Sequence, residues 1–223
     1  STDRVFNVGG LGVDNIAKTK LISKDLLESE LRFKFEERNL LVTFHPVTLE
    51  PDSGVDQLTE LLDALDSFPD IGLIFTLPNA DTGGQLLTKM IDEYVSSREN
   101  ATSYASLGAV KFLSTMACVD GVIGNSSSGL LEAPTFMVGT VNIGNRQGGR
   151  IQAESVVSCK PNRIEIQSAI MKLLSDDFQS VIKNTVSPFG AGKACEKVIE
   201  IIKSISLENL STKVFYDHRN MVK

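Results

Sequence analysis

A glycine- and serine-rich stretch near the middle of the chain has the residue types of an anion site. Gly124-Asn125-Ser126-Ser127-Ser128-Gly129 follows a short apolar run, Val119 to Ile123, and leads into Leu-Leu-Glu-Ala, which can begin a helix. Free backbone N–H groups at a helix start, with hydroxyls beside them, can bind a phosphate. Ser and Asn are also preferred as ordinary N-caps, so the stretch alone leaves both interpretations open.

Two further polar groups carry side chains suited to ligand chemistry. His45 directly follows the apolar run Asn39 to Phe44, and two arginines, Arg146 and Arg150, lie in a glycine-rich loop after residues 135–143. Arginine suits bidentate contacts with phosphate or carboxylate. A structural histidine and a solvated turn are the alternatives. The position of the arginines after an apolar run favours anion contact, whereas for His45 the structural and the ligand-binding interpretations both stay open.

Two weaker signals accompany these groups. Gly9-Gly10-Leu11-Gly12 could cradle a ligand, but it lacks the spacing of a dinucleotide fingerprint, which favours a tight turn. Asn79 and Asp81 lie in a polar loop that follows the apolar run Ile71 to Thr76. That loop is expected at the same edge of the structure as His45.

Apolar runs alternate with helical patterns along the whole chain, which predicts the elements that position these groups. Strands are expected over residues 4–8, 39–44, 71–76, 102–104, 119–123, 135–143 and 155–159. Helices are expected after Ser23 and over residues 54–68, 83–98, 109–118, 163–174, 176–184 and 193–205. The pattern predicts an α/β fold, a Rossmann-like doubly wound parallel sheet of roughly six strands. Because the polar clusters all follow strands, they should meet at one edge of the sheet.

Composition narrows the function classes. The chain has 223 residues and a net charge of −6, with 28 acidic against 22 basic residues. This balance argues against a nucleic-acid partner, which needs a basic face. No run of 18 apolar residues occurs, so no membrane span is expected. Three cysteines without a C-x-x-C pattern, and only two histidines, argue against a disulfide scaffold or zinc site and favour a cytoplasmic protein.

The expected domain organisation is a single domain followed by a tail. Residues 1–205 should form the nucleotide-sugar domain, and residues 206–223 are polar and expected to be partly loose. The chain opens on a predicted strand with no initiator Met. It is therefore expected to be one piece of a longer protein.

Taken together, the motifs resemble those of a known family. The matching pieces are Val5-Phe6-Asn7-Val8-Gly9, Phe44-His45-Pro46-Val47-Thr48, Asn79-Ala80-Asp81-Thr82-Gly83, Gly124 to Gly129 with Glu132, Asn142-Ile143-Gly144-Asn145-Arg146-Gln147-x-Gly149-Arg150 and Phe215-Tyr216-Asp217. In this order they resemble the C-terminal half of UDP-N-acetylglucosamine 2-epimerases. The resemblance is closest to the hydrolysing enzymes of bacterial sialic-acid and capsule synthesis.

The resemblance implies the UDP-binding half of a GT-B fold and a role for each matching residue. It implies that the backbone at Leu107 reads uracil and that Glu132 grips the ribose hydroxyls. It places Asn125, Ser126, Ser127 and Gly129 around the diphosphate, with Arg146 close to the phosphates or supporting that wall. It places His45, as the catalytic candidate, at the junction of diphosphate and sugar. Asn79 and Asp81 border the sugar side.

The implied reaction is elimination of UDP from C1 with proton abstraction at C2, followed by addition of water to release N-acetylmannosamine. The resemblance puts most acid and base groups in an N-terminal half that this chain lacks, and it implies a full-length homo-oligomer with no cofactor or metal. Ala191 stands where many relatives have an acidic residue, so its loop is assigned no role. The alternatives are a non-hydrolysing epimerase, an enzyme acting on UDP-diacetylbacillosamine, the donor half of a GT-B glycosyltransferase, and a non-enzymatic sensor of sugar nucleotides.

Overall fold

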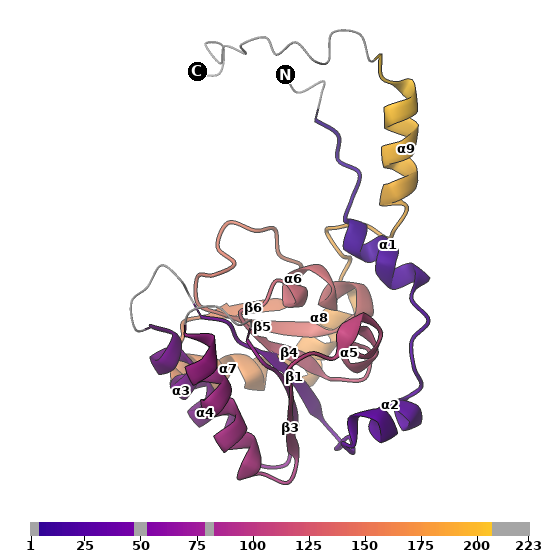
Figure 1. Cartoon of the computed structure of the whole chain (residues 1–223). Helices are drawn as coiled ribbons and strands as arrows, with labels where there is room; N and C mark the ends of the chain where they lie inside the picture. Colours follow the sequence, from indigo (N-terminus) through magenta and orange to yellow (C-terminus); the bar gives the residue numbers. More distant parts are fainter. Residues whose placement is uncertain (1–4, 47–52, 79–82, 207–223) are drawn as a thin grey trace, which may run out of the picture.

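The fold is a single sheet of parallel strands with helices on both faces (Figure 1). The computed structural model describes residues 5–46, 53–78 and 83–206. The strands are β1 (Asn39–Thr43), β2 (Gly72–Thr76), β3 (Ala101–Tyr104), β4 (Gly121–Gly124), β5 (Gly139–Ile143) and β6 (Val156–Cys159). Their spatial order is β3-β2-β1-β4-β5-β6, and every pairing is parallel. The order reverses between β1 and β4, where open α/β sheets bind their ligands.

Burial explains why the central strands were recognisable as apolar runs. Every residue of β1, β2, β4 and β5 is buried, whereas the edge strands β3 and β6 are only partly covered. Strands covered by helices on both faces read as continuous apolar sequence rather than as an alternating pattern. The predicted doubly wound parallel sheet is confirmed.

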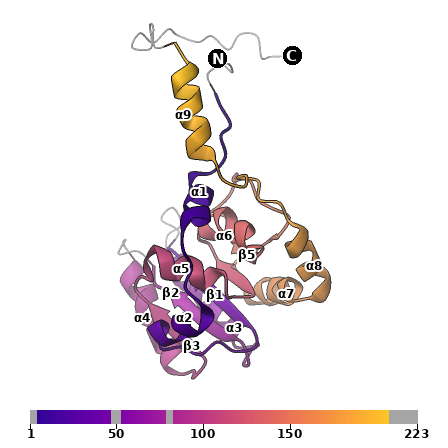
Figure 2. The same cartoon turned by 90° about the vertical axis from the view of Figure 1, so that its right-hand side faces the viewer.

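Helices cover the two faces of the sheet in separate groups (Figure 2). The helices are α1 (Leu11–Lys18), α2 (Lys24–Leu31), α3 (Ser53–Leu65), α4 (Gly84–Ser96), α5 (Gly108–Met116), α6 (Ser128–Leu131), α7 (Arg163–Leu173), α8 (Asp176–Asn184) and α9 (Ala194–Ser204). Helices α3, α4, α7 and α8 share one core with the sheet, and α2 and α5 share the other. Alternate β1 residues point into opposite cores: Leu40 and Val42 into the first, Leu41 into the second.

The first and last described helices lie together, apart from the sheet, and α9 extends away from the body (Figure 1). The carboxylate of Asp14 in α1 accepts hydrogen bonds from the backbone N–H groups of Ala194 and Cys195, at 2.9 and 2.8 Å. These bonds hold the pKa of Asp14 below its usual value, and the bond from Cys195 has the larger effect. The Gly10 N–H also donates to the Phe189 carbonyl at 2.8 Å. Segments from the two ends of the described chain are thus joined to each other.

Two sequence predictions about strands were wrong. Residues 5–8, within the predicted first strand, form no strand, and Val5 is 78% exposed. The strand predicted over 135–143 begins only at Gly139, because Ala133–Phe136 forms a 3-10 helix with Pro134 in its first turn. Met137 then adopts a left-handed conformation with φ of 53°, which ends that turn before the strand starts.

Candidate functional site

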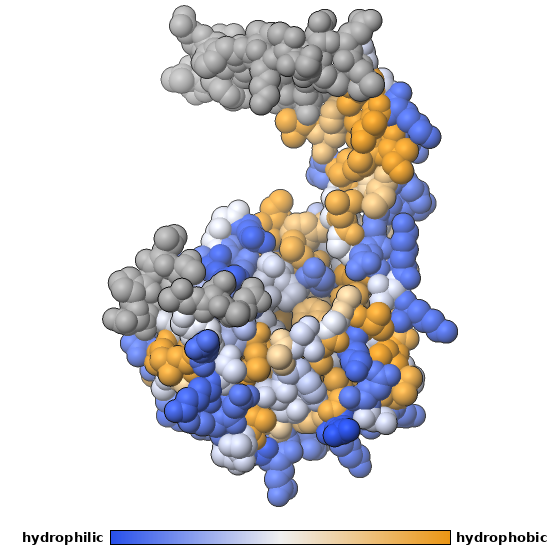
Figure 3. All heavy atoms as spheres, viewed as in Figure 1, coloured by the Kyte–Doolittle hydropathy of each residue, from blue (hydrophilic) through white to orange (hydrophobic). Residues whose placement is uncertain are grey.

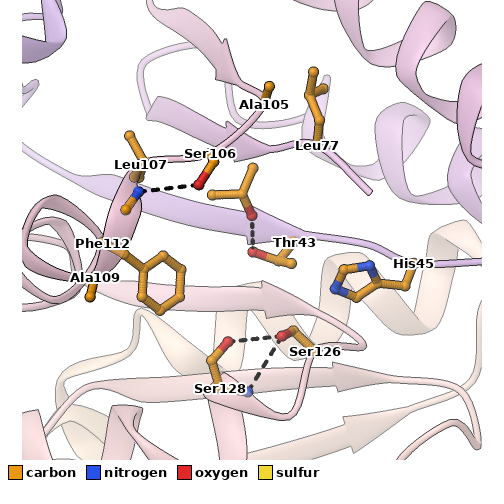
Figure 4. A pocket seen from close by; sticks show the side chains of 12 residues that line it. Thr43, His45, Leu77, Ala105, Ser106, Leu107, Ala109, Phe112, Ser126 and Ser128 are labelled. Carbon is orange, nitrogen blue, oxygen red and sulfur yellow. Dashed lines mark hydrogen bonds between the residues drawn. The ribbon is translucent and has the colours of Figure 1, made fainter. Parts of the chain in front are cut away.

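A cavity of about 390 Å³ opens at the carboxyl end of the sheet, at the point where the strand order reverses. Figure 4 shows the side chains around it. Its lining residues are Thr43, His45, Thr76, Leu77, Ala105, Ser106, Leu107, Gly108, Ala109, Phe112, Ser126 and Ser128. The volume is within the range of small-molecule sites. Hydroxyl groups dominate its polar lining, and none of the lining residues is acidic, lysine or arginine.

Three of the residues predicted from the sequence meet in this cavity. His45 comes from the end of β1, Leu107 from the loop between β3 and α5, and Ser126 from the turn after β4. His45 lies more than 60 positions before each of the other two in the sequence, and the parallel sheet brings all three to one edge. The expected convergence of strand-end groups is therefore found for these three.

The serine turn has a local hydrogen-bond pattern that orients its hydroxyls. The Oγ atoms of Ser126 and Ser128 lie 2.9 Å apart, and the Ser128 N–H points to Ser126 Oγ at 3.4 Å (Figure 4). Ser127 is the N-cap of α6, and its side chain makes no capping hydrogen bond. Ser127 does not line the cavity, whereas Ser128 does. The resemblance had assigned Ser126 and Ser127, and not Ser128, to the diphosphate.

Asn125 is fully buried and its side chain contacts the protein rather than the cavity. Its Oδ1 accepts the His45 N–H and its Nδ2 donates to the His45 carbonyl, both at 2.8 Å. Its own carbonyl accepts from Arg146 Nη1 at 3.1 Å and from Gln147 Nε2 at 2.7 Å. Asn125 therefore joins the end of β1 to the loop after β5. Arg146 thus contacts the serine turn through the Asn125 carbonyl, and its place relative to the phosphates stays a prediction.

Two glycines of the turn are required by close packing. A Cβ on Gly124, whose φ is +133°, would lie 2.0 Å from the Thr43 carbonyl oxygen. A Cβ on Gly129 would lie 2.6 Å from Cγ2 of Thr140, whose hydroxyl donates to the Gly129 carbonyl at 2.7 Å. Gly129, predicted to contact UDP, thus has a structural reason to be glycine: it lets α6 approach β5.

Glu132, one helical turn beyond the serines, has a carboxylate that the protein leaves incompletely bonded. Its Oε2 is buried and has no hydrogen-bond partner in the structure. Loss of water around the carboxylate raises its pKa above the usual value. The start of α1 lies against it, since a Cβ on Gly12 would stand 3.5 Å from Oε1. A buried carboxylate oxygen without a donor is costly unless something else supplies one.

Asn79 and Asp81, predicted on the sugar side, lie outside the described residues. Sequence reasoning missed several groups that line the cavity: Thr43, Thr76, Ser106 and Phe112. The two threonines are the last residues of β1 and β2, a position that could have revealed them. Phe112 lies in the interior of α5, where an aromatic residue is expected to pack in the core. The sequence therefore gave no reason to predict it as a cavity residue.

The described residues contain neither a cluster of three or more His, Cys, Asp or Glu side chains able to hold a metal ion nor a helix long and apolar enough to cross a membrane.

Comparisons with known proteins agree with this geometry. Residues 1–203 match the family model described as UDP-N-acetylglucosamine 2-epimerase. A Campylobacter jejuni protein, GDP/UDP-N,N'-diacetylbacillosamine 2-epimerase (hydrolyzing), is 34% identical over 96% of this chain and 56% of its own length. The polysialic acid biosynthesis protein P7 of Escherichia coli is 35% identical over 96% of this chain and 54% of its own length. The chain therefore spans about half the length of the curated relatives it matches.

Solved structures show the same fold. A Methanocaldococcus jannaschii UDP-GlcNAc 2-epimerase in complex with UDP-GlcNAc and UDP superposes with a TM-score of 0.69 at 15% identity, covering 91% of this chain and 56% of that one. The trehalose-6-phosphate synthase OtsA, which has the GT-B fold, superposes with a TM-score of 0.53 at 12% identity, covering 87% of this chain and 49% of that one. The fold is that of the C-terminal half of a GT-B protein. By its sequence, its sheet and the position of its cavity, the chain belongs to the UDP-N-acetylglucosamine 2-epimerase family.

Proposed function

We propose that this chain is the UDP-binding half of a hydrolysing UDP-N-acetylglucosamine 2-epimerase, which converts UDP-N-acetylglucosamine to N-acetylmannosamine and UDP. The observation that carries the proposal is the meeting of His45, Leu107 and Ser126 in one cavity at the switch between β1 and β4. Relatives at 34% and 35% identity are named as a hydrolysing 2-epimerase and a polysialic acid biosynthesis protein.

We place the nucleotide with its uracil near Leu107 and its diphosphate near the serine turn. Leu107 and Phe112 line the cavity, and we assign the Leu107 backbone to the uracil edge and the Phe112 ring to its aromatic face. The hydroxyls of Ser126 and Ser128 line the cavity and suit a diphosphate, and the Ser127 hydroxyl between them in sequence makes no capping hydrogen bond. The orphaned Glu132 Oε2 is the acceptor for a ribose hydroxyl. Glu132 is not among the residues that line the cavity of the ligand-free chain, so the ribose contact is the part of this assignment that the Glu132 variants test.

The proposed reaction places the developing negative charge on the departing UDP. When the C1–O bond breaks and a base removes the C2 proton, UDP departs with the bonding pair and a glycal remains. Water then adds across the glycal double bond to give N-acetylmannosamine. Donors fixed around the diphosphate stabilise the leaving charge. His45 lines the same cavity and is the residue of this chain best placed to assist the leaving group, although one histidine cannot supply both proton transfers.

We assign the remaining proton transfers to an N-terminal half, with residues 1–205 forming the C-terminal half and residues 206–223 a tail. Apolar side chains stand exposed on α9 and on the segment before α1, where Figure 3 shows hydrophobic colour. Val5 is 78% exposed, and Ile199 and Ile202 are 52% and 60% exposed. Exposed apolar groups gathered in one region are typical of an interaction surface. They are the candidate contact with the N-terminal half.

That contact can be tested by adding the N-terminal half in trans. Ile199→Ser with Ile202→Ser should weaken its binding to this chain, as measured by calorimetry. Ile164→Ser is the matched control, since Ile164 is 75% exposed on α7. Equal affinity for all three proteins would exclude α9 from the interface.

We further propose that the enzyme acts in the cytoplasm, in sialic-acid and capsule synthesis, as a homo-oligomer without a cofactor. The three cysteines are free thiols, which supports a reducing compartment. The name of the Campylobacter jejuni relative supports a second candidate substrate, a UDP-linked diacetylbacillosamine. Both substrates would use the same nucleotide site.

The nucleotide assignment is tested by calorimetry of this chain with UDP. UDP should bind, and Ser127→Ala and Glu132→Ala should each weaken it. No detectable heat with the wild-type chain would overturn the assignment of the cavity. The reaction is tested by NMR of products formed by the complete enzyme from each UDP-sugar. Free N-acetylmannosamine without an acceptor supports hydrolytic epimerisation, whereas UDP-N-acetylmannosamine, transfer to an acceptor, or intact substrate would support the non-hydrolysing, glycosyltransferase or sensor alternatives.

A further inference from the structure

The backbone hydrogen bonding between β1 and β4 does not continue regularly to His45. The last paired residues are Thr43 and Gly124, and the Asn125 N–H still donates to the Thr43 carbonyl at 3.2 Å. In a regular parallel ladder the Asn125 carbonyl would next accept the N–H of His45. Here the side-chain carbonyl of Asn125 accepts that N–H, and the side-chain amide donates to the His45 carbonyl. A side-chain amide thus replaces the neighbouring backbone.

The carbonyl of Asn125 is turned away from His45 because another residue holds it. Gln147 Nε2 donates to this carbonyl at 2.7 Å, and Arg146 Nη1 adds a second bond at 3.1 Å. Gln147 is only 2% exposed, whereas Arg146 lies on the exposed side of the loop. A buried amide bonded to a buried carbonyl is the more rigid of the two contacts, since solvent cannot compete for it.

We propose that Gln147 is a positioning residue for His45, acting through Asn125. It fixes the Asn125 carbonyl, and this orientation leaves the Asn125 side chain to bind both backbone groups of His45. Neither Gln147 nor Asn125 lines the cavity. The inference rests on the proposed function, because His45 must take part in the reaction for its position to matter. It assigns Asn125 to the placement of His45 rather than to direct contact with UDP.

The test uses Gln147→Met, which keeps the length of the side chain and removes the donor. The chain contains only two histidines, so its ring NMR signals are few, and His45→Asn assigns them. Gln147→Met should shift the His45 ring signal of the free chain while UDP still binds. In the complete enzyme, kcat should fall roughly 10- to 100-fold, as expected for a misplaced reacting group, with little change in KM.

Gln85→Met is the matched control, because Gln85 is exposed on α4. It should leave the His45 signal and kcat unchanged. Asn125→Asp is the second variant: it keeps the acceptor for the His45 N–H, loses the donor to the His45 carbonyl, and should also move the signal and lower kcat. Because Gln147 acts only through the link from Asn125 to His45, an unchanged signal and kcat in Asn125→Asp would overturn the proposal even if Gln147→Met does not fold.

An unchanged His45 signal together with wild-type kcat in Gln147→Met would overturn the positioning role. A loss confined to UDP affinity would also overturn it, since Gln147 would then support only the serine turn. If the wild-type chain does not bind UDP, the proposed function fails instead. The His45 signals of the free proteins would still report whether Gln147 positions His45.

Discussion

The carboxylate of Asp14 accepts the backbone N–H of Ala194, a residue 180 positions further along the chain, at 2.9 Å. A second bond, from the Cys195 N–H at 2.8 Å, completes the attachment of α9 to α1. A carboxylate at a helix start satisfies free N–H groups and interacts favourably with the helix dipole. One acidic side chain of α1 thus bonds the first two N–H groups of α9, beside the bond from the Gly10 N–H to the Phe189 carbonyl.

Asp14→Asn should lower the thermal midpoint of the chain at neutral pH, because the neutral amide offers only one acceptor oxygen to two N–H groups. The pKa of Asp14 is lowered in the folded protein from an ordinary value of 3.8. Its stabilising effect is therefore present above pH 3.8 and is lost as the pH falls through the folded-state pKa. The difference in midpoint between wild type and Asp14→Asn should shrink over that acidic range. Asp70→Asn, at an exposed position, should show no such trend.

Glu132→Gln should weaken UDP binding roughly 10- to 100-fold, the range expected for losing a hydrogen bond to a charged group. The folded-state pKa of Glu132 is raised from 4.5, so its ionisation destabilises the free fold above pH 4.5, and this cost is relieved as the pH falls through the raised pKa. Glu132→Gln should therefore keep or raise the thermal midpoint of the ligand-free chain at neutral pH.

The pH dependence of UDP affinity checks the same residue. Wild-type affinity should fall as the pH drops through the raised pKa of Glu132, because the protonated carboxyl is a poorer acceptor. Calorimetry between pH 7 and the lowest pH at which the fold persists measures this. Glu154→Gln, at an exposed position, keeps Glu132 and should show the same loss as wild type, whereas an equal loss in Glu132→Gln would contradict the assignment to Glu132.

Gly124→Ala should destabilise the chain by about 3 kcal/mol or more, since left-handed strain and steric overlap with Thr43 act together. Gly149→Ala is the matched control: Gly149 has φ of +76° and no atom within 4 Å of an added Cβ. It should cost only the conformational strain, about 1–2 kcal/mol. Urea unfolding of both variants separates the two effects, and equal losses would show that the contact with Thr43 is unimportant.

Phe112→Leu should weaken UDP binding by about 1 kcal/mol, the usual magnitude for an aromatic contact beyond its buried area. Leucine keeps the apolar character of the cavity wall but cannot stack on a base. Pyrophosphate has no base, so its affinity should be the same for both proteins. Equal UDP affinity for wild type and Phe112→Leu, by calorimetry, would place the base elsewhere.

The sheet could be predicted because its central strands are buried on both faces. Residues 39–44 and 71–76 are almost wholly apolar, and no competing structure explains such runs between helical patterns. Residues 5–8 look similar over a few positions, yet they find no neighbouring strand. Residues 135–138 are β-branched and aromatic in part, but Pro134 continues a helical turn from Glu132. Short runs carry too little information to exclude these outcomes.

Only those cavity residues that lie near the ends of predicted strands could be predicted from the sequence. His45 and Ser126 lie two residues beyond the ends of β1 and β4, so their position at the sheet edge could be predicted from the sequence. The engagement of the Asn125 amide with His45 depends on a contact between residues 80 positions apart, and no local pattern encodes it. The same holds for Gln147, whose role appears only once the loop after β5 is folded against the turn.

The exposed isoleucines of α9 have a consequence for handling the chain. Helix α9 extends away from the body and exposes Ile199 and Ile202 to water. The isolated chain should therefore self-associate through this helix. Light scattering should therefore give a negative second virial coefficient at neutral pH. NMR linewidths should broaden as the concentration rises, and spectra are best recorded from dilute samples.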